Sequence, residues 1–258
     1  MTRAATAALS YFARLFLRTP SLYVLTSAGE ALVEPAEAIE RSVAQMERRV
    51  TGLDEQLTGS VRVATTDSLG KRFVIPAIAR MRSEHPGIEV VCLTSQDIAN
   101  LTRREADIAI RTIRPDAPDL IVRRLASLKT GIYASRAYLA ARGTPAPGNG
   151  FSDHDLVAYQ HSVAPTMPFA FCGEPTGGGK VVFRTSSSIT LVEAAAAGIG
   201  VAELPCYRAD TESDLVRIMP ERSADFDVWL VAHADLYKTA RIQALIRALV
   251  GAFDSGPP

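Results

Sequence analysis

The architecture of this chain is visible in residues 61–110, whose sequence is VRVATTDSLGKRFVIPAIARMRSEHPGIEVVCLTSQDIANLTRREADIAI. Short runs rich in β-branched residues alternate there with stretches of helical periodicity. The runs predict strands at 61–65, 88–93 and 106–110, and the stretches between them predict helices at 69–84 and 98–104. Strands that alternate with helices predict a mostly parallel sheet with right-handed crossovers, and therefore an α/β fold.

The alternation continues after a break rich in glycine and proline, ARGTPAPGNG at 141–150, which starts a second lobe. Asp153–Leu156 predicts the start of a short helix. The turn GEPTGGG predicts a hairpin between strands at 169–171 and 180–184. The remaining expected elements are strands at 120–128, 130–135, 200–204 and 226–232, and helices at 136–141, 189–197 and 238–253.

A long helix with a heptad repeat precedes the α/β region. Ser27 and Glu30 have the spacing of a capping box, which marks the start of the helix. Apolar residues then recur in steps of four and three, at Leu32, Ala36, Ile39, Val43, Met46, Val50, Leu53 and Leu57. This is the period of a two-stranded coiled coil, so we expect the helix to pair with a second copy of the chain. The alternative is an amphipathic helix packed on its own domain.

A short ribbon is expected before the helix, because Phe16-Leu17 and Tyr23-Val24-Leu25 flank a turn at Pro20-Ser21.

Composition and charge argue against several classes of function. The formal net charge is zero, so the whole protein has no field that attracts nucleic acid or a membrane. No apolar run approaches the roughly 18 residues that span a bilayer. The three cysteines form no CxxC pair, which fits a reducing compartment. The four histidines lack metal-ligand spacing, and TGGGK departs from a phosphate-binding loop. We therefore expect a cytoplasmic protein that has no cofactor or metal and is not an enzyme.

Four segments, taken in order, resemble the LysR-type transcriptional regulators. RLFLRTPSLYVLTSAGEAL (14–32) is similar to their wing and the start of their linker helix. VRVATTDSLGKRFVIPAIARMRSEHPGIEVVCLT (61–94) resembles the first strand–helix–strand of their effector domain, and ADIAIR (106–111) the strand that follows. SSSITLVEAAAAGIGVAELP (186–205) is similar to the helix and strand of their second lobe. The resemblance covers nearly the whole chain.

The resemblance implies a two-lobed effector-binding domain of the periplasmic-binding-protein type, preceded by a long linker helix and assembled as a dimer or tetramer. It implies a remnant of the DNA-binding domain at 1–26, the linker helix at 27–58 and the effector domain at 60–258. The first lobe would take about 60–135 and 235–258, and the second about 136–234. Along the helix, the dimerisation candidates are Leu32, Ile39, Val43, Met46, Val50 and Leu53.

DNA contact is expected from the wing, because a wing arginine commonly contacts phosphate or the minor groove. The candidates are Arg14, Arg18 and Ser21. In this family a winged helix-turn-helix occupies about the first 60 residues, whereas about a dozen residues precede the RLF segment in this chain. Promoter DNA is therefore an expected partner if a helix-turn-helix is supplied. The alternatives are a ligand-binding module without DNA-binding activity and an enzyme on a related scaffold.

A small-molecule effector is expected between the lobes, because ligands of open parallel sheets bind beyond the carboxyl ends of strands. Hydroxyls and helix-start amides at those ends predict a neutral or anion-accepting site, and the alternative role for each hydroxyl is helix capping. Asp67 opposes a carboxylate ligand unless Arg111 or Arg184 offsets its charge. The candidates are Thr65, Thr66, Ser68, Thr94, Ser95, Ser186, Ser187 and Ser188, and the resemblance adds Thr130 and Ile132.

Overall fold

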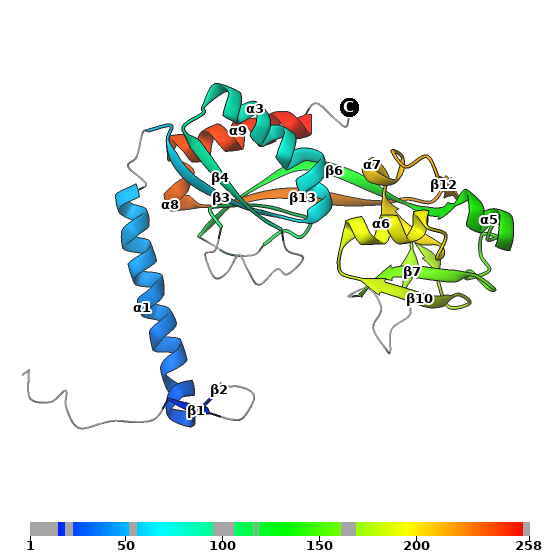
Figure 1. Cartoon of the computed structure of the whole chain (residues 1–258), viewed down its shortest axis with the longest axis horizontal. Coiled ribbons are helices and arrows are strands. Elements are labelled where there is room, and N and C mark those ends of the chain that lie inside the picture. The colour runs from blue at the N-terminus through cyan, green and yellow to red at the C-terminus, as the bar shows by residue number, and fades with distance from the viewer. Residues whose placement is uncertain are drawn as a thin grey trace, which may run out of the picture. The chain divides into compact units, whose positions relative to one another are not determined.

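The chain forms two compact units, Met1–Leu53 and Asp54–Pro258 (Figure 1). The computed structural model describes residues 15–18, 23–51, 56–94, 106–115, 117, 119–160 and 169–254. Among the helices in these ranges, none has both the length and the apolar character needed to cross a bilayer.

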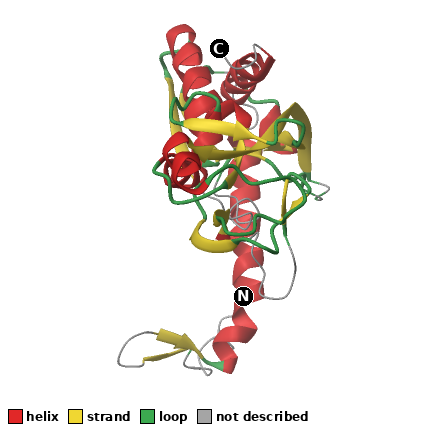
Figure 2. Cartoon of the chain, turned by 90° about the vertical axis from the view of Figure 1, so that its right-hand side faces the viewer, coloured by secondary structure: helices red, strands yellow, loops and turns green. Residues whose placement is uncertain are grey.

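The first unit consists of a ribbon and a long helix. Strands β1 (Phe16–Arg18) and β2 (Tyr23–Leu25) pair antiparallel, which confirms the predicted ribbon. Helix α1 (Ser27–Thr51) follows, and Figure 2 shows the ribbon beside its first turn.

The predicted capping box is wrong by one residue. The helix is capped by Thr26, whose Oγ1 accepts the Gly29 amide at 3.1 Å. Thr26 is held there because its own amide donates to the Leu15 carbonyl of the ribbon at 3.0 Å. Glycine is required at 29, because a Cβ would lie 2.2 Å from that carbonyl oxygen.

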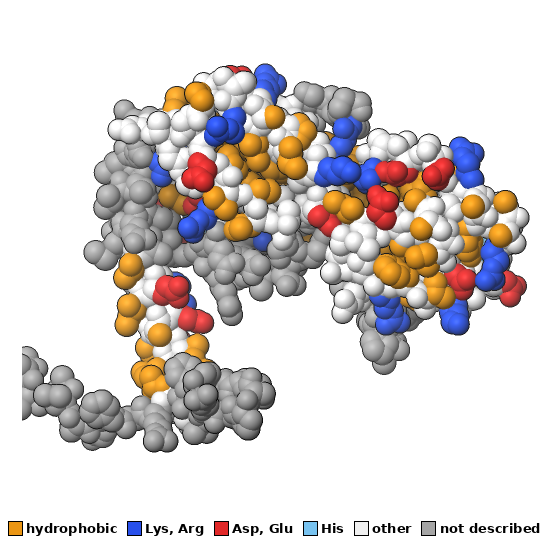
Figure 3. Space-filling view, in the orientation of Figure 1, with side chains coloured by type: hydrophobic (Ala, Val, Ile, Leu, Met, Phe, Trp, Pro, Cys, Tyr) orange, Lys and Arg blue, Asp and Glu red, His pale blue; other side chains and the backbone are white. Residues whose placement is uncertain are grey.

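Helix α1 exposes part of the predicted apolar seam. Leu32, Ile39 and Val43 are 48%, 67% and 50% exposed, and Figure 3 shows hydrophobic side chains along the helix. The helix as described ends at Thr51, and residues 56–58 are not helical, so Leu57 does not extend the seam.

The second unit contains a mixed sheet that, in the described part of the chain, has seven strands. Its order is β11-β6-β13-β5-β3-β4, with β12 paired to β6. The strands of the first lobe are β3 (Gly59–Thr65), β4 (Ile88–Thr94) and β5 (Ile108–Arg111). Strand β3 pairs parallel with both β4 and β5, as the sequence predicts.

Two long antiparallel strands connect the lobes (Figure 1). They are β6 (Leu120–Ser135) and β13 (Ala224–His233), which pair along the full length of β13. The two separate strands predicted at 120–128 and 130–135 are thus one strand. Its first half belongs to the first lobe, and its second half pairs with strands of the second.

The second lobe is built on the far end of β6. Strands β11 (Ala202–Pro205) and β12 (Leu215–Ile218) pair with that end, and β7 (Asp155–Tyr159) pairs parallel with β10 (Lys180–Thr185). Its helices are α5 (Arg136–Arg142), α6 (Ser188–Ala196) and α7 (Cys206–Ala209). Strand β12 was not predicted.

Two predictions in this lobe are wrong. The helix expected at 153–156 is a turn followed by β7, because Phe151 and Asp153 have φ of 61° and 66°, outside the helical region. The hairpin is also tighter than expected. Strand β8 (Ala170–Phe171) turns directly into β9 (Glu174–Pro175), while β10 pairs with β7 instead.

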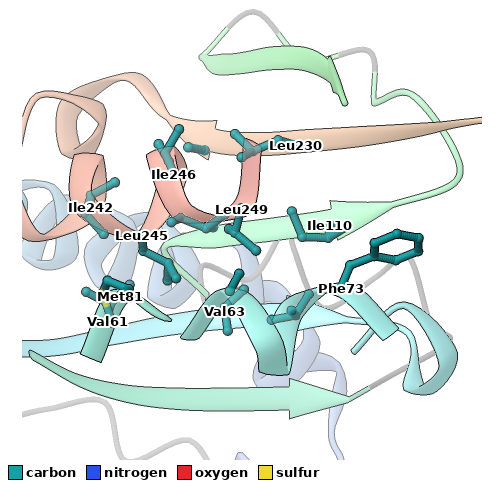
Figure 4. Packing of buried hydrophobic residues seen from close by; sticks show 14 of the residues in the cluster. Val61, Val63, Phe73, Met81, Ile110, Leu230, Ile242, Leu245, Ile246 and Leu249 are labelled. Atoms are coloured by element: carbon teal, nitrogen blue, oxygen red, sulfur yellow. The ribbon is translucent and has the colours of Figure 1, made fainter. Parts of the chain in front are cut away.

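The core of the first lobe lies between the sheet and two packed helices. Helix α2 (Asp67–Leu69) continues through the π-helical turn η1 (Gly70–Val74) into α3 (Ile75–Glu84). The helix predicted at 238–253 is α9 (Ala240–Asp254), and a short helix that was not predicted, α8 (Ala234–Tyr237), precedes it. Figure 4 shows Leu245, Ile246 and Leu249 of α9 facing the buried side chains of the strands and of α3.

We expect Leu249→Ala to lower the free energy of unfolding by about 2–5 kcal/mol, since this fully buried side chain would leave a cavity. Arg247→Ala, at an exposed position of the same helix, should change it by less than about 0.5 kcal/mol. Urea unfolding followed by circular dichroism measures both. Equal effects would contradict the packing of α9 on the sheet.

Candidate functional site

A cavity of about 420 Å³ lies between the two lobes. Its wall combines side chains from both lobes with residues of the connecting strands. From the first lobe come Thr66, Ser68, Leu69, Thr112 and Ile113, and from the connecting strands Thr130, Ala224, Asp225 and Phe226. The second lobe contributes Val157, Ala158, Tyr159, Phe169, Ala170, Phe171, Ser188, Glu203, Pro205 and Tyr207. The volume lies within the range of small-molecule sites, about 300–1,000 Å³.

The first-lobe wall is formed where β3 ends and α2 begins. Thr66 caps the helix, and its Oγ1 accepts the Leu69 amide at 3.4 Å. Ser68 is buried, and its Oγ shares a hydrogen bond of 2.8 Å with the Tyr207 hydroxyl of the second lobe. The ring of Tyr207 packs against Phe73, with ring centroids 5.3 Å apart, so this tyrosine joins the core of the first lobe.

The Asp67 carboxylate links the two helix starts that face each other across the site. Its Oδ1 accepts the Ser68 amide at 2.7 Å. Its Oδ2 accepts the Ser187 hydroxyl at 2.5 Å and the Ile189 amide at 3.4 Å. A carboxylate is favoured at a helix start, where backbone amides carry partial positive charge. One side chain of the first lobe therefore stabilises the start of α6 in the second.

The second-lobe wall is formed by the start of α6 and by β7. Ser187 caps α6, because its Oγ accepts the Thr190 amide at 3.1 Å. The neighbouring Ser188 is buried, and its Oγ accepts the Tyr159 hydroxyl at 2.7 Å. Ser188 and Tyr159 therefore present a connected pair of hydroxyls to the cavity.

Glu203 is held by hydrogen bonds at the junction of β11 and β6. Its Oε1 accepts the Thr130 hydroxyl at 2.6 Å, and its Oε2 accepts the Cys172 amide at 2.8 Å. Cys172 and Gly173 form the turn between β8 and β9, with φ of 47° and 80°. Such positive φ values are typical of a tight hairpin turn but are costly for cysteine. The bond to Glu203 fixes this turn, and with it the neighbouring Phe171 of the wall.

Burial and nearby carboxylates keep the phenols of the site protonated. Burial raises the pKa of Tyr159, the bond to Ser188 lowers it, and the negative charges of Asp67 and Glu203 raise it further. Burial likewise raises the pKa of Tyr207 to about 12, opposed by the bond to Ser68 and assisted by Asp67. Both phenols therefore keep their proton at neutral pH, and Tyr159 donates its proton to Ser188.

The structure brings some of the predicted effector residues together and separates others. Thr66, Ser68, Thr130 and Ser188 line the cavity. Five others do not line it. Thr65 and Ile132 are buried, Ser187 caps α6, and Thr94 and Ser186 are exposed. Ser95 lies outside the described residues. The Thr65 hydroxyl is buried with no hydrogen-bond partner in the described part of the chain.

Sequence reasoning missed Glu203, Tyr207 and the aromatic wall. Glu203 stands within VAELP, the strand already assigned to the second lobe, so a carboxylate on a buried strand was the available signal. The aromatic residues come from separate segments of the sequence, so no local pattern groups them. They are Tyr159, Phe169, Phe171, Tyr207 and Phe226.

The DNA-binding candidates lie outside the part of the chain that can be described in full. Arg14 and Ser21 are not among the described residues, and only the backbone of Arg18 is, as the last residue of β1. Along α1, the backbone of Met46 and Val50 is described but their side chains are not, and Leu53 lies outside the described residues. Over the described ranges, no cluster of three His, Cys, Asp or Glu side chains is arranged to hold a metal ion.

Comparison with known proteins identifies the family. The model of the LysR substrate binding domain matches residues 54–254. The HTH-type transcriptional activator AaeR of Escherichia coli (strain K12) is 25% identical over 174 residues, which are 65% of this chain and 56% of AaeR. The match thus spans little more than half the length of that relative. The HTH-type transcriptional regulator PgrR of the same strain is 24% identical over 82% of this chain and 74% of its own length.

Solved structures have the same fold. The structure of CrgA, a LysR-type transcriptional regulator from Neisseria meningitidis, superposes with a TM-score of 0.69 at 22% identity, over 93% of this chain and 84% of CrgA. At this identity the likeness shows the fold alone. It agrees with the two lobes and connecting strands described above, and the matching relatives are regulators rather than enzymes. Because the family model covers most of its length, this chain belongs to the LysR family, through its substrate-binding domain.

Proposed function

We propose that this chain senses a small molecule in the cavity between its lobes and controls transcription as a LysR-type regulator, in a dimer or tetramer. Thr66, Ser68, Thr130 and Ser188, which line the cavity, are the proposed effector contacts. Regulators of this kind act on promoter DNA, so the proposed place of action is the cytoplasm.

The observation that carries the proposal is the hydrogen bonding between the two lobes beside the cavity. Ser68 bonds Tyr207, and Asp67 bonds Ser187, so each contact joins one lobe to the other beside the cavity. A ligand that fills the cavity touches both lobes. It therefore favours one arrangement of the lobes over another, and this differential binding is what an effector needs to shift an equilibrium.

The proposed dimer uses the exposed seam of α1. Leu32, Ile39 and Val43 hold the heptad spacing and remain open to solvent in the single chain. Pairing two such helices would bury these side chains and stabilise the dimer.

Promoter binding is proposed for the assembly that includes a DNA-reading helix-turn-helix, with Arg14, Arg18 and Ser21 as contacts of the wing. The alternative is a ligand-binding module that does not read DNA. A mobility-shift assay at low salt distinguishes the two, because phosphate contacts are strongest there.

Ala170→Trp should weaken effector binding, because Ala170 lines the cavity and an indole there would reduce the space for a ligand. Val182→Trp is the matched control, since Val182 lies on another strand of the same lobe and is 43% exposed. A metabolite library screened by thermal shift on the wild type identifies the ligands to compare. Ligands that stabilise the wild type and the control more than Ala170→Trp support the proposal. Ligands that bind all three proteins equally would place binding elsewhere.

Val43→Asp should convert the dimer to a monomer, because it places two carboxylates at the centre of the seam. Ala38→Asp adds the same charge to the exposed outer face of the helix and should leave the dimer intact. Light scattering measures the mass of each. An unchanged mass for Val43→Asp would exclude this seam as the dimer contact.

A further inference from the structure

The charge of the cavity wall is negative or neutral. Among the described residues that line it there is no lysine, arginine or histidine, and the charged residues are Glu203 and Asp225. Across the two connecting strands, Asp225 lies opposite Lys129. The neighbouring pair is Ala224 and Thr130. Side chains of successive residues point to opposite faces of a sheet. Glu203, which bonds Thr130, is therefore the carboxylate on the cavity face.

The positions where an anion would bind are already occupied by the protein. At the start of α2, the amides of Ser68 and Leu69 donate to Asp67 and Thr66. At the start of α6, the amide of Ile189 donates to Asp67, and that of Thr190 to Ser187. An anionic ligand would thus compete with the Asp67 carboxylate for donors that are in use, and would be repelled by its charge.

Glu203 has acceptor capacity that the protein does not use. A carboxylate offers about four acceptor positions, and the bonds from Thr130 and Cys172 fill two of them. No ion pair of Glu203 is found among the described residues, whereas the fully buried Glu174 is paired with Arg222 at 2.7 Å. A half-buried carboxylate is stabilised when a cation is brought to it.

Aromatic rings surround the same space. Phe169 and Phe171 lie with centroids 5.6 Å apart and nearly perpendicular planes, and Tyr159, Tyr207 and Phe226 complete the wall. Aromatic faces attract organic cations and also accept apolar groups. Negative charge lies near these rings, because the pKa of Tyr159 is raised first by burial and also by the charges of Asp67 and Glu203.

We propose that the cavity binds an organic cation, a protonated amine with an aromatic or aliphatic body, whose ammonium group lies against the Glu203 carboxylate. This inference rests on the proposed function, because it names the class of effector for the same cavity. The ammonium group donates to the free acceptor positions of Glu203. The apolar body lies among Phe169, Phe171 and Phe226, and the hydroxyls of Ser68 and Ser188 are open to further polar groups of the ligand.

The test compares three probes that share a phenethyl group and differ in charge: phenethylamine, 3-phenylpropionate and 3-phenylpropionamide. Titration calorimetry on the full chain measures each affinity. We expect phenethylamine to bind about tenfold or more tighter than 3-phenylpropionate, the effect of one hydrogen bond to a charged group. Tighter binding of 3-phenylpropionate, or no binding of phenethylamine at millimolar concentration, would overturn the inference.

Glu203→Gln identifies the group responsible. We expect it to weaken the binding of phenethylamine about tenfold or more and to leave the binding of 3-phenylpropionamide unchanged. The glutamine oxygen can still accept the Cys172 amide, and its NH2 group can donate to Thr130, whose hydroxyl then donates to the Ala224 carbonyl, so the ionic contact is the interaction that is lost. The amide probe also reports that the cavity is intact in the variant. Glu221→Gln removes an exposed carboxylate of the second lobe outside the lining and should change nothing. Glu203→Asp, which retains the charge, should keep the preference for the amine.

The outcomes separate the class of ligand from the function of the cavity. If 3-phenylpropionate binds in preference to the amine and Ala170→Trp weakens that binding, the cavity is an effector site and the ammonium assignment is wrong. If phenethylamine binds equally to the wild type, Glu203→Gln and Ala170→Trp, it binds elsewhere on the protein, and the assignment is again wrong.

Discussion

The candidate site depends on one contact, in which the Asp67 carboxylate of the first lobe accepts the Ser187 hydroxyl and the Ile189 amide of the second. Two helix starts face each other there, and each brings backbone amides that need acceptors. The Asp67 carboxylate supplies acceptors to both helix starts. The polarity of the cavity beside this contact is set by other groups, namely the Glu203 carboxylate and the hydroxyl groups of the lining.

Local patterns predicted the parts of the fold in which neighbouring segments pair. The β3–α3–β4 unit follows from alternating apolar runs, and β5 joins the same sheet. The patterns failed at 153–159, because Leu156, Val157 and Ala158 are all buried and show no alternation, and because positive φ angles break the chain before them. The pairing of β10 with β7 was also missed, since nothing local distinguishes it from a hairpin.

The candidate site was partly predictable for the same reason. Hydroxyls at strand ends and helix starts are local features, and Thr66, Ser68 and Ser188 do line the cavity. Glu203 meets Thr130 only through the register of β11 on β6, 73 residues apart in sequence. Tyr207 enters the site because its ring leaves the second lobe and packs against Phe73 of the first. The first contact depends on strand register and the second on how the two lobes meet. The sequence pattern of a single segment contains neither.

A crystal structure of the chain grown with phenethylamine tests the central claim most directly. The account predicts electron density between the lobes, with the amine nitrogen within hydrogen-bonding distance of the Glu203 carboxylate and with Asp67 still bonded to Ser187. Density for the ligand on any other surface would contradict the account. So would lobes so far apart that Ser68 and Ser188 face separate regions of solvent.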